Sequence, residues 1–461
     1  MSFWYKNHDK TKRATNISKH QQISYFRQMN KRILKLAIPN IISNISIPLL
    51  GMVDTALMGH MDSLVYVGAI ALGTMVFNFI YWGLGFLRMG TVGFTAQAKG
   101  ANDKKEITRI LYRAGLIALL GGIFIIAIHP FIIDFGLGLT SASGEVKLNA
   151  RAYFNIRVWA APASLLILVL SGWFVGMQNT IYPMIISIIT NILNIAFSMW
   201  FVFGMEMKSE GVAWGTLISQ YLSALLGVGF ILYKYREYII KVIWSKLLDI
   251  KALKEFANVN SDIFIRTLGI IFVFSFFTVQ SANINDKILA VNAILFQFFI
   301  FFSYMLDGFA NAAEALSGEA VGMNSRKTMI RYTKYLFAWG LVFSLLFTFA
   351  YAFFGNQILG LLTNNKEIIE TAQPMMFWVI MMPLVSYGAF MWDGIFIGAT
   401  ASKAMRNTMI LATIVVFMPL FYFGPWDLIN RLWIAFMAYM LARGLFLGLV
   451  FKSSVLRKLS D

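Results

Sequence analysis

A single carboxylate, Asp54, interrupts the first long apolar stretch of the chain, residues 36–58. Asn40 and Asn44 fall on the same helical stripe as this acid. An ionised side chain is costly in lipid, so we expect the stripe to face a cavity or another helix. Pro48 lacks an N–H group and is predicted to bend this helix as a hinge.

A second group of oxygen-bearing side chains lies in the two apolar stretches predicted at residues 183–204 and 211–233. Asn191, Asn194 and Ser198 share one helical face, and Thr216 follows in the next stretch. Oxygen ligands of this kind suit a hard cation such as Na⁺. A buried carboxylate suits a proton equally well. We therefore predict an ion-coupling site that holds H⁺ or Na⁺, made of Asp54, Asn194, Ser198 and Thr216. Helix-to-helix hydrogen bonding is the alternative role for the asparagines.

The second half of the chain carries its own acids within apolar stretches. Asp307, Asn311 and Glu314 form one stripe, and Asp393 lies inside a later span. Asp307 and Asp393 are the stronger candidates for substrate or proton binding, whereas Glu314 is expected to be structural or part of a gate. Asn40, Asn44, Asn191, Asn311, Asn78 and Tyr81 complete the predicted substrate cavity, with Arg88 beside them.

Arg266 and Arg443 are two further arginines of the predicted spans. Both lie near span ends that we assign to the cytoplasmic side. Arginines in such positions extend to the interface or pair with an acid. A cavity rich in intramembrane cations is therefore not expected.

The composition indicates a polytopic α-helical membrane protein. Hydrophobic residues make up 58% of the 461 residues and charged residues only 13%, against about 25% in soluble proteins. About twelve stretches are long enough to span a bilayer. The chain contains no cysteine, which excludes disulfides and thiolate metal sites.

Lys and Arg concentrate on one side of the predicted spans, and this asymmetry accounts for the net charge of +17 without nucleic acid. Both termini are therefore predicted to be cytoplasmic, with the chain in the plasma (inner) membrane. We divide it into a basic tail (1–35), an N-terminal lobe (36–233), a cytoplasmic linker (234–261), a C-terminal lobe (262–451) and a short tail (452–461).

An internal repeat relates the two lobes. Residues 96–109 match residues 318–331 at an offset of 222, with Gly100 on Gly322 and Asn102 on Asn324. Six spans per lobe is an even number, so both lobes enter the membrane from the same side. Parallel repeats around a central site are typical of alternating-access carriers.

Motifs of enzymes are missing from the sequence. It contains no HExxH, GxSxG, Walker A or GxGxxG pattern, and its four histidines form no cluster with ligand spacing. No cofactor is expected, and an ion gradient is the predicted source of energy.

The chain resembles the multidrug and toxic compound extrusion (MATE) family, most closely its DinF-like branch. The resemblance rests on MVDTALMGH (52–60), NILNIAFSMWFVFGMEM (191–207), GVAWGT (211–216), AVNAILFQFFIFFSYMLDGFANAAEALSG (290–318), WDGIFIGAT (392–400) and MRNTM (405–409). It covers nearly the whole chain from Leu36.

The resemblance implies two six-helix lobes around a cleft, and antiport of cationic or amphipathic small molecules against H⁺ or Na⁺. It assigns ion coupling to Asp54, with Asn194 and Thr216 as partners, and matches Asp393 to the family's tenth-span acid. Ser198 stands where the family often has a second acid, so this site carries one formal charge. A lone titrating Asp54 and a Na⁺ held by Asp54 with neutral oxygens both remain open.

We expect a monomeric multidrug exporter rather than an enzyme. Two alternatives remain. A flippase for a lipid-linked precursor would need a large cationic cleft, and the lack of intramembrane Lys or Arg beyond span ends counts against it. An intramembrane aspartyl protease using Asp307 and Asp393 lacks the GxGD motif.

Overall fold

The computed structural model of the chain describes residues 26–46, 63–239, 247 and 249–460. Asp54 and Pro48 lie outside these ranges. Within them the chain is almost entirely helical, with one isolated bridge between Ser325 and Ser460. Eleven helical segments of the described residues are long and apolar enough to cross a membrane. Together with the helix at residues 26–46 they confirm about twelve membrane helices.

Among the described residues of the N-terminal half, seven further α-helices follow residues 26–46. They are α2 (Leu64–Leu84), α3 (Phe86–Gly100), α4 (Lys104–Gly138), α5 (Gly144–Arg157), α6 (Ala161–Gly176), α7 (Ile181–Met199) and α8 (Lys208–Lys234). A π-helical turn, η2 (Trp200–Gly204), continues α7, and a 3₁₀ turn, η1 (Val158–Ala160), joins α5 to α6.

The C-terminal half repeats this plan. Its helices are α10 (Ile250–Ile284), α11 (Asp286–Gly322), α12 (Arg326–Leu362), α13 (Lys366–Ala372), α14 (Met376–Gly398), α15 (Ser402–Leu411), α16 (Met418–Phe423) and α17 (Leu428–Ser454). The turn η4 (Gln373–Met375) joins α13 to α14, and η5 (Ala412–Phe417), a π-helical turn, joins α15 to α16. Residues 250–261 of the predicted linker belong to α10.

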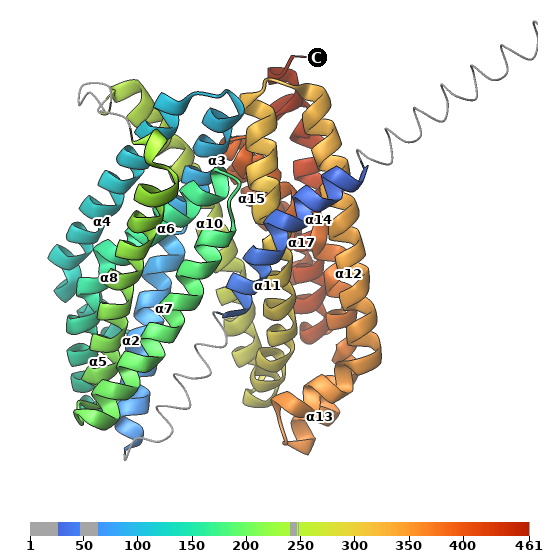
Figure 1. The fold of residues 1–461 in the computed structure, drawn as a ribbon. Coiled ribbons are helices and arrows are strands. Elements are labelled where there is room, and N and C mark those ends of the chain that lie inside the picture. The colour runs from blue at the N-terminus through green and yellow to red at the C-terminus, as the bar shows by residue number, and fades with distance from the viewer. Residues whose placement is uncertain (1–25, 47–62, 240–246, 248, 461) are drawn as a thin grey trace, which may run out of the picture.

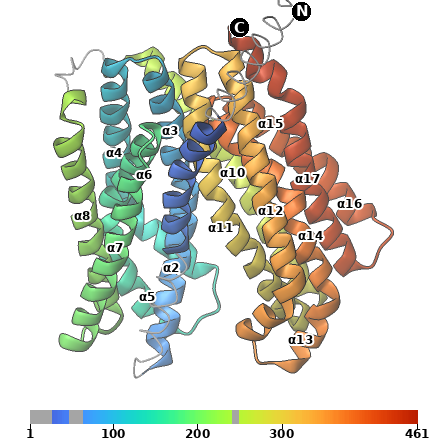
Figure 2. The same ribbon diagram turned by 45° about the vertical axis from the view of Figure 1, so that its right-hand side comes forward.

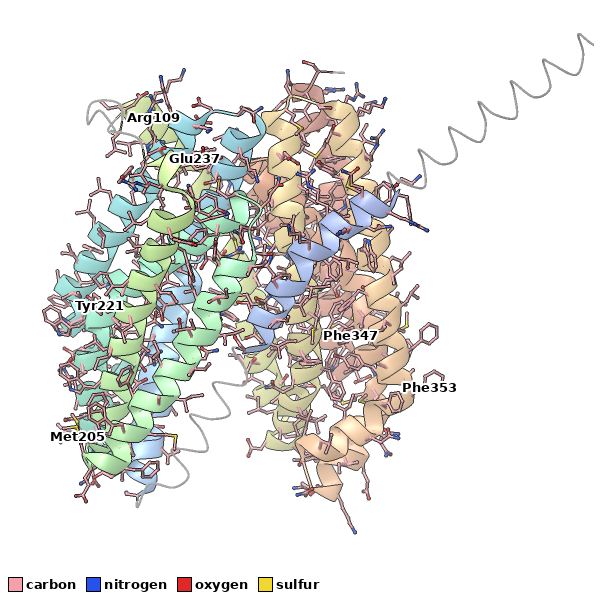
Figure 3. All side chains as sticks on the ribbon, viewed as in Figure 1. Arg109, Met205, Tyr221, Glu237, Phe347 and Phe353 are labelled. Atoms are coloured by element: carbon pink, nitrogen blue, oxygen red, sulfur yellow. The ribbon has the colours of Figure 1, made fainter. Side chains whose placement is uncertain are left out.

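The helices are longer than the apolar runs within them. The 35 residues of α4 rise about 52 Å, well beyond a hydrocarbon core of about 30 Å. Arg109 and Glu237 lie at one end of the molecule in Figure 3, whereas Tyr221 and Phe353 lie on its sides. Phe353 is 72% exposed, and large apolar side chains exposed along the sides fit contact with lipid.

The helices form two lobes that carry the internal repeat. In Figures 1 and 2, α4, α7 and α8 group on one side, and α12, α14 and α17 on the other. The backbone shows the repeat directly, because α3 and α11 end in the same way. Asn102 and Asn324 both have positive φ, and the N–H of the following residue bonds a carbonyl five residues back. This is the Schellman cap. Gln178 and Thr400 repeat it at the same offset of 222.

The helix at residues 26–46 lies between the lobes (Figure 1). Met29, Ile33, Leu36 and Ala37 are buried in the C-terminal core. Near its other end, the Ser46 hydroxyl lies 3.1 Å from the Ser187 hydroxyl, and the Ser46 carbonyl accepts from Asn191, both residues of α7. The helix is thus bonded to the N-terminal lobe while it packs in the core of the C-terminal lobe.

The lobes meet where α3 and α11 end. Any Cβ on Gly100 would overlap the Glu319 carbonyl, and one on Gly322 would overlap the Gln97 carbonyl. Gln97 and Glu319 are also 222 residues apart, so the contact has pseudo-twofold symmetry. The C-terminus lies at this end, where Ser460 bonds Asn324 and Arg326. We call it the closed end.

Candidate functional site

A cavity of about 930 Å³ lies between the two lobes. Its lining residues run along α11 from Leu289 to Glu314, so the cavity stops before the closed end. Aromatic side chains form much of the wall, among them Phe274, Phe299 and Phe390. This volume and this mostly apolar lining suit a drug-sized organic molecule.

Glu314 forms an ion pair across the two lobes. Its carboxylate accepts from Arg88 of α3 at 3.2 and 3.3 Å, with both guanidinium nitrogens taking part. The Glu314 side chain is only 3% exposed. A bidentate contact between α11 and α3 is the geometry that the predicted structural or gating role of Glu314 requires.

Asp393 is held by two arginines. Arg266 of α10 and Arg443 of α17 both donate to its Oδ2 atom, the latter at 2.6 Å. All three side chains are at most 9% exposed. The prediction that both arginines lie near span ends is wrong, because α10 begins at Ile250 and α17 runs from Leu428 to Ser454. Arg266 and Arg443 lie near the middle of their helices.

Asp307 differs from the other two acids of the cavity. It lies in the middle of α11, lines the cavity and makes no hydrogen bond or ion pair with the residues that the structure describes. Its carboxylate is close enough to Arg88, Arg266, Glu314 and Asp393 to interact electrostatically with each. Asp307 is therefore the acid of this wall whose oxygens are available to a ligand.

The structure brings together the described members of the predicted ion-coupling site. Asn194 donates to the Thr216 hydroxyl at 2.9 Å, joining α7 to α8. Ser198 is fully buried against Gly215. The Asn194 Oδ1 and Ser198 Oγ atoms are buried without a hydrogen-bond partner among the described residues. Two acceptor oxygens are thus left in one small region.

The predicted cavity residues separate into two groups. Asn40, Asn44, Asn191 and Asn311 line the cavity. Asn44 also donates to the Tyr304 carbonyl of α11 at 2.9 Å. Asn78 and Tyr81 are not among the residues that line this cavity. Asn78 is exposed, and Tyr81 packs on Phe77 within the N-terminal lobe. A hydropathy pattern places residues along a helix but leaves the rotation of that helix open.

Sequence reasoning missed the ionic network of the closed end. Arg32 donates to Glu319 at 2.6 Å, to Gln178 at 2.7 Å and to Tyr332 at 2.7 Å. Because Gln178 belongs to the N-terminal lobe and the other two to the C-terminal lobe, Arg32 connects the lobes. Gln97 adds bonds to Gly398 and Thr400. The matching segments 96–109 and 318–331 contained the signal, since Gln97 and Glu319 are equivalent positions of the repeat.

Glu319→Gln is expected to weaken the closed end. The ion pair is partly buried, so its loss should favour opening by roughly 1 kcal/mol, about fivefold in population. The cysteine-free chain allows spin labels at Lys105→Cys and Lys327→Cys, both exposed at this end. Double electron–electron resonance between the two labels should show a larger population at the longer distance. Glu237→Gln, which breaks an exposed pair with Lys104, is the control, and an equal change in both variants would contradict the prediction.

Comparison with known proteins bears on the whole architecture. The family model MatE matches residues 39–200 and 263–423, one segment in each lobe. The chain belongs to the MATE family. It is 36% identical to DNA damage-inducible protein F of Escherichia coli, over 93% of this chain and 94% of that one. It is 23% identical to the probable multidrug resistance protein NorM of Thermotoga maritima, over 83% and 80%.

A solved MATE structure has the same fold. The Vibrio cholerae MATE transporter VcmN in the bent form aligns with a TM-score of 0.84 at 17% identity, covering 94% of this chain and 98% of that chain. The protein is accordingly a multi-pass membrane transporter of the MATE efflux type with two six-helix lobes. The cavity lies at the interface between the two repeats.

Proposed function

We propose that the protein is an ion-coupled antiporter that exports cationic or amphipathic small molecules by alternating access. The observation that carries the proposal is the cavity of about 930 Å³ between the lobes, which ends at the closed end. A cavity shut at one end by a symmetric contact between repeats is what one state of a rocking carrier requires. Rocking the lobes about α3 and α11 would close the other end.

The walls of the cavity support an amphipathic cargo. Phe274, Phe299 and Phe390 offer aromatic faces to an apolar body, and aromatic faces also attract cations. Asp307 presents a carboxylate that no described residue neutralises by a direct contact. A cationic group of the cargo would be attracted to it.

We propose that Asp54 couples transport to H⁺ or Na⁺ together with Asn194, Ser198 and Thr216. The support is the pair of buried oxygens, Asn194 Oδ1 and Ser198 Oγ, that lack partners among the described residues. A Na⁺ ion or a protonated carboxyl group would supply what they lack. Binding of the ion removes the free charge of Asp54 and shifts the equilibrium by its differential affinity for the two states. The Pro48 hinge then lets the first helix bend.

We further propose that the protein acts as a monomer in the plasma (inner) membrane with both termini in the cytoplasm. The excess of Lys and Arg on the side of the termini supports this orientation. The closed end would then face the cytoplasm and the cavity would open outward.

The charges of the cavity wall bear on the flippase alternative. The prediction of no intramembrane cations beyond span ends is wrong for Arg88, Arg266 and Arg443. These three arginines are matched by three carboxylates in the same wall. A pyrophosphate needs a strongly positive cleft, so the antiporter is favoured. A protease using Asp307 and Asp393 is disfavoured because two guanidinium groups occupy Asp393.

Asp54→Asn is expected to abolish gradient-driven export while leaving the protein folded. The test uses reconstituted vesicles, a fluorescent cationic dye and either a proton or a sodium gradient alone. Dye movement with the proton gradient only, lost in the variant, identifies H⁺ as the coupling ion. Movement with sodium only identifies Na⁺, and Ser198→Ala should then weaken sodium dependence. Asp134→Asn, at an exposed acid, is the control. Full coupled export by Asp54→Asn would refute the role of Asp54.

A further inference from the structure

Two arginines share one carboxylate at the wall of the cavity. Arg266 and Arg443 come from α10 and α17 and approach the same oxygen, Oδ2, of Asp393 on α14. Both arginines belong to the cavity lining, yet their side chains are only 9% and 5% exposed. Two fixed cations therefore stand at the inner surface of the cavity with one direct anionic partner.

Some N–H donors of the two arginines lack a hydrogen-bond acceptor among the described residues. The Nε atoms of Arg266 and Arg443 are buried and have no acceptor among the described residues. Each guanidinium has five N–H donors in a planar fork that matches a carboxylate or a sulfonate. Buried donors of a charged group ordinarily have partners. An anionic group entering the cavity would supply acceptors and the missing negative charge.

The neighbouring side chains do not neutralise the excess positive charge of Arg266 and Arg443. Glu314 is paired with Arg88 in bidentate fashion, one acid for one base. Arg443 lies 5.6 Å from the centre of the Tyr439 ring, a contact that leaves its charge in place. Asp307 interacts electrostatically with Arg266 but makes no direct contact with it. The excess positive charge and the free acid thus occupy adjacent parts of one wall.

We propose that Arg266 and Arg443 form a subsite for an anionic group of the cargo. The inference rests on the proposed transport function and narrows its substrate class to zwitterionic amphiphiles. The anionic group binds the arginine pair, the cationic group is drawn to Asp307, and the apolar body lies against Phe274 and Phe299. The wall as a whole is then matched in charge by a molecule of zero net charge.

The test compares two dyes that differ only at one group. Rhodamine B is a zwitterion with a free carboxylate, and its ethyl ester is a cation with the same ring system. Binding to the purified protein in nanodiscs is followed by fluorescence polarisation. We expect the wild type to bind rhodamine B about tenfold more tightly than the ester, as for a charge-assisted hydrogen bond.

Arg443→Gln should remove this preference without removing the cavity. Asp393 keeps Arg266 as a one-to-one partner, so no buried charge is left alone. Affinity for rhodamine B should fall about tenfold, and affinity for the ester should stay within about twofold, which also shows that the variant is folded. Arg443→Lys should restore part of the preference. Arg406→Gln, at an arginine outside the cavity that pairs with Asp262, is the matched control.

Different failures point to different errors. An equal loss of affinity for both dyes in Arg443→Gln would overturn the proposed subsite. So would a wild type that binds rhodamine B no more tightly than its ester. If the wild type shows no preference and chloride added to a gluconate buffer stabilises it only when Arg443 is present, the pair holds an inorganic anion and the assignment to cargo is wrong. Failure of any ion gradient to move either dye counts against the proposed transport function, whereas a binding preference lost in Arg443→Gln still supports the subsite.

Discussion

Asp393→Asn is expected to destabilise the C-terminal lobe by about 3–5 kcal/mol, because two buried guanidinium groups lose their shared counterion. In a lobe of this size the melting temperature should fall by roughly 10 °C. Arg266, Asp393 and Arg443 join α10, α14 and α17, so the loss reaches three helices. Thermal unfolding in detergent, followed by tryptophan fluorescence, measures the change.

Asp307→Asn is the matched control, since it removes the same charge from the same cavity. Asp307 has no ion pair among the described residues, so its replacement should shift the melting temperature by only a few degrees. Its expected effect is on the binding of cationic cargo. Equal thermal shifts in the two variants would show that the arginine pair does not depend on Asp393.

Gly322→Leu should abolish transport by preventing the closed end from forming. A side chain at Gly322 would overlap the Gln97 backbone, which cannot move away without displacing α3. The lobes should still fold, because the contact lies between them. Spin labels at Lys105→Cys and Lys327→Cys should then report a longer distance throughout the population. Labels at Ser141→Cys and Asn364→Cys, at the opposite end, should move closer together.

Gly360→Leu is the control for this experiment. Gly360 also lies near a helix end, but a Cβ there meets nothing within 4 Å. It should retain transport and wild-type distances. If Gly322→Leu also retained transport and wild-type distances, the contact at the closed end would not be needed for transport.

The fold could be predicted because its signals are local. Apolar runs marked about twelve helices, and the offset of 222 identified the repeat that the caps at Asn102 and Asn324 later showed. Helix ends were less predictable. The polar turns of α10 before residue 262 extend a helix beyond the membrane, and hydropathy does not detect them. Because the predicted span starts only at residue 262, Arg266 is predicted near a span end, although it lies near the middle of α10.

The candidate site was predictable only in its residue types. Asp307, Glu314 and Asp393 were recognised as intramembrane acids, but their partners lie far away in sequence. Arg88 and Glu314 are 226 residues apart, and Arg266 and Asp393 are 127 apart. No spacing rule within one helix detects such pairs. The same limitation hid Arg32, whose partners belong to both lobes.

The balance of charges on the cavity wall affects how transport depends on the membrane potential. Arg88, Arg266 and Arg443 cancel Asp307, Glu314 and Asp393 when all are ionised, so the wall adds no net charge to the charges of the cargo and the coupling ion. Voltage dependence then arises from the cargo, the coupling ion and Asp54. A cation exchanged for one H⁺ would be electrically silent. A zwitterion leaving against one H⁺ would carry a charge inward, and each 100 mV would add about 2.3 kcal/mol to the driving force.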